Sequence, residues 1–169
     1  MEEVAPPFIE LFRWMDNNLP GTFWLRESTY GFTSLLTLHV VGVCIFLGLI
    51  FMMDLRLVGV ANRATRAATI QAKLFPWQMV GFAVIVLSGV GLFYAQPMTY
   101  YNKVWFWVKM GLIVLAGVNA GVIHLLTRTS EGWDSGLARM AGAFSLLLWT
   151  GVLFSGRLVA YEWWTNFYF

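Results

Sequence analysis

The chain has 169 residues, of which 59% are hydrophobic and only 12% are charged, and its mean hydropathy is +0.66. Soluble domains carry about 25% charged residues, so this composition excludes an ordinary soluble protein and predicts a single membrane domain. The net charge of +2 comes without a basic run, so we expect no nucleic-acid partner, and the one cysteine, Cys44, excludes an intrachain disulfide or a CxxC motif.

The first 29 residues precede the first long apolar run. Apolar side chains recur there at helical spacing with polar side chains between them; the two sets are Phe8, Leu11, Phe12 and Met15, and Glu10, Arg13, Asp16 and Asn17. This pattern is typical of a short amphipathic helix that lies flat on a membrane surface. We therefore interpret residues 1–29 as an interfacial segment.

Four apolar runs follow, each long enough to cross a bilayer core, which needs about 20 residues. We expect spans at residues 30–53, 75–95, 104–126 and 137–161, with a turn at Pro76 as the second begins. Gly117 and Gly121 form a small-xxx-small pair in the third span, which predicts close packing against another helix. Residues 162–169 are rich in aromatic side chains and predict an anchor at the membrane interface.

These elements predict an all-α fold: an integral membrane four-helix up-down bundle, residues 30–161, with an N-terminal interfacial amphipathic helix. Lysine and arginine are concentrated in the first and third connections, and cytoplasmic loops carry such an excess. We therefore expect both termini outside the cytoplasm, on the periplasmic face of a bacterial inner membrane. The basic residues on the two sides are Arg56, Arg63, Arg66, Lys73, Arg128 and Arg139 against Arg13, Arg26 and Lys103.

His39 lies inside the first span, where an ionisable side chain is costly unless it has a partner. Helical rise places Ser88, Met110 and Lys109 near its depth, with Arg157 nearer the outer edge. One hypothesis is a b-type haem with His39 and Met110 as axial ligands and the two cations on its propionates. The same group suits a quinone headgroup. The alternative is a cofactor-free site in which His39 hydrogen-bonds Ser88, or a threonine of the fourth span, and only ties helices together.

The second histidine, His124, belongs to a different depth. At 1.5 Å per residue, His39 lies roughly 13 Å below the outer edge and His124 roughly 30 Å below it. One haem between the two is therefore excluded. His124 is level with Met52, Met79 and Met140. Imidazole and thioether groups suit Cu(I), so a copper site is one hypothesis, and gap-filling by flexible methionines is the alternative.

Two further polar side chains lie in the inner halves of the spans. Asp54 is expected to pair with Arg139 or His124 across the bundle, because a partner must compensate a carboxylate at this depth. Asn119 is expected to hydrogen-bond Ser145 on the fourth span. Both interactions would join helices rather than form a catalytic group.

The sequence carries none of the motifs of hydrolytic or phosphate-binding enzymes. It has no HExxH, no phosphate loop and no paired carboxylates within a span. We therefore expect a non-enzymatic protein. The small size and aromatic surface favour a cofactor-binding or accessory subunit that associates with the lipid bilayer and with other membrane subunits or further copies of itself.

Four segments carry a resemblance to a known family. They read LHVVGVCIFLGLIFMMDLRLVGV, FPWQMVGFAVIVLSGVGLF, WVKMGLIVLAGVNAGVIH and SLLLWTGVLFSGRLVAY. Together, over about residues 24–161, they resemble a family of small four-span bacterial inner-membrane proteins classed as a domain of unknown function. The resemblance implies a four-helix membrane fold and no established activity. More loosely, the chain is similar to copper-export membrane domains and to b-type transmembrane cytochromes, although it lacks the second histidine pair of the latter.

Overall fold

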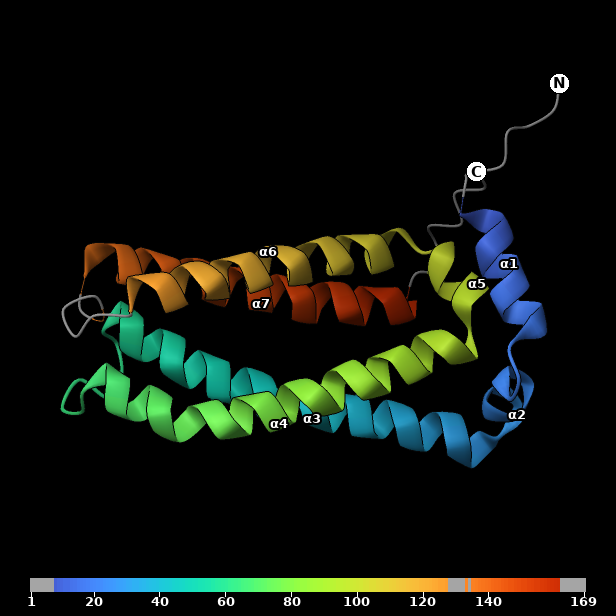
Figure 1. Ribbon diagram of the computed structural model, residues 1–169, viewed down its shortest axis with the longest axis horizontal. Helices are drawn as coiled ribbons and strands as arrows, with labels where there is room; N and C mark the ends of the chain where they lie inside the picture. The colour runs from blue at the N-terminus through green and yellow to red at the C-terminus, as the bar shows by residue number, and fades with distance from the viewer. Residues whose placement is uncertain (1–7, 128–132, 134, 162–169) are drawn as a thin grey trace, which may run out of the picture.

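The computed structural model of the protein describes residues 8–127, 133 and 135–161, and Figure 1 shows their arrangement. This part of the chain is helical and contains no strand. Four long helices lie along one another, while three short helices gather at one end. In chain order the helices are α1 (Ile9–Asn18), α2 (Thr22–Glu27), α3 (Thr29–Val58), α4 (Ala67–Ala95), α5 (Pro97–Tyr101), α6 (Val104–Leu126) and α7 (Gly136–Tyr161).

The four long helices, α3, α4, α6 and α7, are each long and apolar enough to cross a membrane. They confirm the predicted all-α membrane bundle. α3 and α6 run in one direction and α4 and α7 in the other, so the bundle has the up-down order (Figure 1). In a bilayer every backbone polar group must find its partner inside the chain, and a helix satisfies that requirement within itself.

The second span begins earlier than predicted. α4 runs unbroken from Ala67 to Ala95 with Pro76 inside it, so the predicted turn at Pro76 is wrong. A proline removes one backbone N–H from the helix, and membrane helices tolerate that loss because neighbouring groups and small local adjustments of the helix satisfy the freed carbonyl. α3 likewise continues past the predicted end, to Val58, where Gly59 ends it with φ of 85°.

The short helices cover the end of the bundle at which α3 and α6 begin (Figure 1). The ring of Phe12 on α1 packs against Phe93 at 5.6 Å, Tyr101 at 4.8 Å and Trp107 at 6.5 Å between centroids. An ion pair of 3.5 Å between Arg26 and Asp16 joins α2 to α1. The amphipathic helix α1 therefore lies across the ends of the spans, as an interfacial helix does.

The long helices form two pairs, α3 with α4 and α6 with α7, and α3 joins the pairs by packing on α7. Phe46 of α3 meets Trp149 of α7 edge to face, with 5.2 Å between ring centroids. Nearer the other end, a Cβ added at Gly142 of α7 would lie 2.9 Å from Cβ of Leu57. In lipid such close packing replaces the hydrophobic effect as the force that associates helices.

The predicted small-xxx-small pair does not form a helix contact within the chain. Gly117 and Gly121 are both exposed, and a Cβ added at either would meet nothing within 4 Å among the described residues. The close approach predicted for these glycines occurs instead at Gly142. The spacing of the pair was visible in the sequence, but the face of α6 that turns toward α7 was not.

Candidate functional site

His39 is held by a chain of hydrogen bonds between α3 and α4. Its Nδ1 lies 2.9 Å from Oγ of Ser88, and that hydroxyl donates its own proton to the Val84 carbonyl at 2.5 Å. A serine hydroxyl has one proton, so its oxygen must accept from the histidine. This arrangement corresponds to the imidazole tautomer with its proton on Nδ1, in which Nε2 keeps a lone pair.

A glycine and a buried serine make the contact possible. Ser88 is only 2% exposed, so its hydroxyl bonds in a dry part of the interface. At the next position, a Cβ added at Gly89 would lie 3.1 Å from Cε1 of His39. The absence of a side chain at Gly89 thus gives the imidazole room against α4.

Lys109 brings a cation to the same region from α6. Its side chain is partly buried and passes Gly156 of α7, where an added Cβ would lie 3.8 Å from both Cε and Nζ. Its positive charge acts electrostatically on the imidazole of His39. All four spans therefore contribute to one region, through His39, Ser88 with Gly89, Lys109 and Gly156.

The other two residues predicted for this site turn away from it. Met110 is 41% exposed on the surface of α6. Arg157 is also exposed, and its Nη2 donates to the hydroxyl of Tyr161 at 2.6 Å while the guanidinium lies 4.4 Å above that ring. The structure thus brings together His39, Ser88 and Lys109 and leaves Met110 and Arg157 outside their group.

The residues predicted for a copper site are all exposed. His124 is in the last turn of α6, and Met52, Met79 and Met140 are on the surfaces of three other helices, with Met140 as much as 70% exposed. Across the described residues, no group of three or more histidine, cysteine, aspartate or glutamate side chains is placed to hold a metal ion. A copper site here would therefore lie on the outer surface of the bundle.

Asp54 is buried where α3 crosses α7. It is 3% exposed, and its carboxyl group interacts with the hydroxyl of Ser145. Its Oδ2 is buried without a hydrogen-bond partner. The predicted pairing with Arg139 or His124 is not among the ion pairs of the described residues. The rotation of α3 explains this difference, since it turns Asp54 toward the serine face of α7.

Asn119 also bonds to a different partner from the one predicted. Its amide Nδ2 donates to the backbone carbonyl of Ala141 at 3.0 Å, rather than to Ser145. The bond still joins α6 to α7, so the expected helix pair is correct and the expected atom is not. A backbone carbonyl has a second lone pair and can accept this additional bond without losing its helical one.

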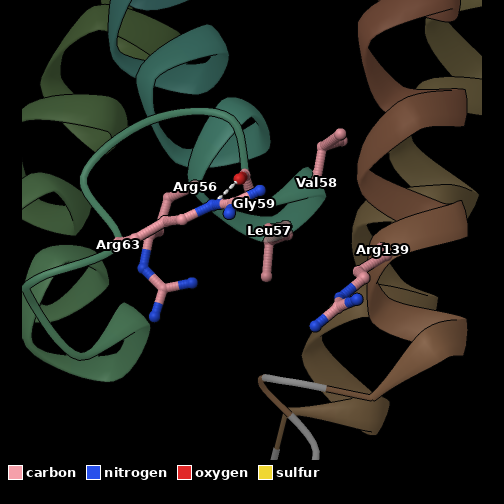
Figure 2. A pocket seen from close by; sticks show the side chains of 6 residues that line it. All are labelled: Arg56, Leu57, Val58, Gly59, Arg63 and Arg139. Atoms are coloured by element: carbon pink, nitrogen blue, oxygen red, sulfur yellow. Dashed lines mark hydrogen bonds between the residues drawn. The ribbon is translucent and has the colours of Figure 1, made fainter.

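A second site, which we did not predict, lies at the other end of α3. Six residues line a pocket of about 290 Å³: Arg56, Leu57, Val58, Gly59, Arg63 and Arg139. Figure 2 shows Arg139 extending from α7 toward the end of α3, with the side chain of Leu57 between it and Arg56. Three of these lining residues are arginines, and none of the described residues that line the pocket is acidic, so the described lining is basic.

Comparison with protein families identifies the group to which the chain belongs. Residues 11–162 match the profile of DUF6644, a family of unknown function. The chain belongs to the DUF6644 family. This confirms the resemblance to a four-span family without established activity. No curated protein and no solved structure matches the chain.

In this DUF6644 protein, depth along the spans predicted the contact between His39 and Ser88 and the nearby cation of Lys109. It failed for Met110 and Arg157 because depth does not determine on which side of a helix a residue lies. The basic pocket was missed for another reason. Its arginines are visible in the sequence, but the left-handed turn at Gly59 that brings Arg63 back to the end of α3 is not.

Proposed function

We propose that this protein binds a b-type haem through Nε2 of His39 and serves as a cofactor-binding subunit in or beside a membrane electron-transfer assembly. The observation that carries the proposal is the chain of hydrogen bonds from His39 Nδ1 to Ser88 Oγ to the Val84 carbonyl. Histidines that ligate a metal donate their other ring N–H to such a partner, which fixes the tautomer and the ring orientation. His39 makes this contact with Ser88, which in turn bonds the Val84 carbonyl.

The surroundings of His39 suit a haem in two further ways. Gly89 lets the imidazole pack closely against α4, which holds the ring in place. Lys109 supplies a cation that would pair with a propionate carboxylate, as a charge-assisted hydrogen bond. Because Met110 and Arg157 lie outside this group, His39 is the one axial ligand that we assign to the chain. When bound, the haem supplies one-electron chemistry, and the protein supplies the ligand and a dry environment.

A quinone headgroup is the second candidate, favoured by the combination of an acceptor and a cation. Nε2 of His39 would accept a hydrogen bond from a quinol hydroxyl, while Lys109 would donate to a quinone carbonyl. Both candidates use the same two side chains. They differ in what the purified protein would contain, since a haem absorbs strongly near 400 nm and a quinone does not.

The competing class is a cofactor-free accessory subunit. In that case the bond between His39 and Ser88 only ties α3 to α4, and Lys109 extends toward the interface with its ammonium group. A copper-handling protein that uses His124, Met52, Met79 and Met140 is a further alternative. It would need a second copy or another subunit to enclose the metal, because these side chains are on the bundle surface.

The cellular setting that we propose is a bacterial inner membrane with both termini in the periplasm. It rests on the excess of lysine and arginine at the ends of the spans opposite α1. A subunit with one cofactor must exchange electrons with a neighbour. We therefore propose that other membrane subunits, or a second copy of the chain, lie beside it.

The test is the composition of the protein purified in a mild detergent from haem-replete cells. We expect a Soret band in the wild type that is lost in His39→Ala and retained in His124→Ala, the matched control at the other histidine. If an organic extract of the wild-type protein contains quinone and that of His39→Ala does not, the ligand is a quinone and not a haem. Folded wild-type protein that contains neither compound would overturn both and leave the accessory role.

A further inference from the structure

We infer that the pocket at the end of α3 binds a phosphate group through Arg56, Arg63 and Arg139. It is separate from the region of His39, because the 20 residues from His39 to Gly59 span about 30 Å of helix. It is therefore independent of the proposed cofactor. The inference rests on how the backbone fixes the arginines, on the charge of the pocket and on its size.

Two of the three guanidinium groups are fixed by backbone carbonyls. Nε of Arg56 donates to the Thr65 carbonyl at 2.9 Å, and Nε of Arg63 donates to the carbonyl of Gly59. Gly59 adopts the left-handed conformation that ends α3, and this turn folds the loop back so that Arg63 reaches it. A bond at Nε holds the plane of a guanidinium in place, which lowers the entropy lost when a ligand binds.

The third arginine comes from another helix. Arg139 lies in the first turns of α7, and its guanidinium extends toward the end of α3 (Figure 2). Within the described residues, neither Arg63 nor Arg139 forms an ion pair with a carboxylate. Asp54, one turn before Leu57, is buried toward Ser145 and does not line the pocket. Three arginines thus line the pocket, and no acidic residue of the described part of the chain is among its lining groups.

The charge and the size of the pocket suit a phosphate group. Arginine presents a planar fork of donors that pairs with two oxygens of a phosphate at once. About 290 Å³ is at the lower end of the range for ligand pockets, enough for a headgroup or a small phosphorylated molecule. A basic pocket between transmembrane helices is also where anionic phospholipid headgroups bind. The ligand is therefore either a lipid headgroup or a free phosphate.

Two probes distinguish these sources, each applied to the full-length protein in a maltoside detergent that contains no phosphate. The first is inorganic phosphate, titrated by calorimetry in a chloride buffer of low ionic strength. The second is phosphatidylglycerol, added together with an equal amount of phosphatidylcholine. Native mass spectrometry then measures how many molecules of each lipid stay bound to the protein. Arg139→Gln tests the pocket, because Arg139 is exposed and substitutions of exposed side chains usually change stability little. Arg66→Gln is the matched control. Arg66 is an exposed arginine of the connection between α3 and α4, which also carries Arg63, but Arg66 does not line the pocket.

We expect Arg139→Gln to weaken binding about tenfold to a hundredfold, the value of one charge-assisted hydrogen bond, and Arg66→Gln to change it less than threefold. Arginine-dependent binding of inorganic phosphate identifies a soluble ligand. Retention of phosphatidylglycerol alone identifies a lipid headgroup. The inference is overturned if neither probe binds, or if Arg139→Gln binds as the wild type does.

Discussion

Replacement of Ser88 by alanine tests whether its hydroxyl is the partner that fixes His39. The hydroxyl is buried and accepts the proton on Nδ1 of His39 at 2.9 Å. Without it, a ring N–H between two helices loses its acceptor. Hydrogen bonds between membrane helices are worth about 0.6 kcal/mol on average and at most about 1.7 kcal/mol. Because His39 is partly buried, we expect Ser88→Ala to lower the free energy of unfolding by about 1 kcal/mol, within that range.

Ser155→Ala is the matched control. Ser155 is also 2% exposed, but its hydroxyl donates to the Val152 carbonyl of its own helix at 3.0 Å. Its removal leaves no other side chain without a partner, and alanine is the better helix former by up to about 0.5 kcal/mol. We therefore expect Ser155→Ala to be neutral or slightly stabilising.

The measurement is reversible unfolding of both variants in mixed micelles of sodium dodecyl sulfate and a mild detergent, followed by circular dichroism. The difference between the two variants isolates the bond to His39 from the general effect of removing a buried hydroxyl. Equal stabilities of Ser88→Ala and Ser155→Ala would refute the reasoning, because the hydrogen bond would then carry no net free energy.

Three further predictions concern packing, metal binding and orientation. Gly142→Ala should destabilise the protein by about 1–3 kcal/mol, since its Cβ would lie 2.9 Å from that of Leu57. Gly117→Ala, where an added Cβ meets nothing among the described residues, should be neutral or stabilising by up to about 1 kcal/mol in the same unfolding assay. An equal loss of stability in Gly142→Ala and Gly117→Ala would contradict the close contact between α7 and α3 at Gly142. If the protein handles copper, elemental analysis should find metal in the wild type and less in His124→Ala, and equal contents would reject that role. In a Cys44→Ala background, Asn18→Cys should react with an impermeant maleimide in intact spheroplasts and Asn62→Cys should not. Labelling of Asn62→Cys alone would show that the orientation is the opposite of the proposed one.

The fold could be predicted because a bilayer leaves little choice. Twenty apolar residues without a barrel pattern must form a helix there, so hydropathy gave the spans, and the amphipathic spacing around Phe12 gave α1. The error at Pro76 came from applying the rule for soluble helices, in which proline ends a helix, to one in lipid.

The sites were predicted only as far as depth determines them. Depth placed Ser88 opposite His39 correctly, because residues at one level on adjacent antiparallel helices can meet. It could not determine the rotation of each helix about its axis, which places Met110 on the surface and brings Asp54 to Ser145. The arginine pocket depends in addition on the turn at Gly59, a loop geometry that hydrophobic periodicity does not report.

The absorption spectrum of the wild-type protein, with haem and protein quantified in the same sample, decides whether His39 is a haem ligand. We expect a Soret band from an equimolar amount of haem in protein purified from haem-replete cells, and we expect added imidazole to shift the wavelength of that band. A folded preparation that is colourless would contradict the claim that His39 is a haem ligand.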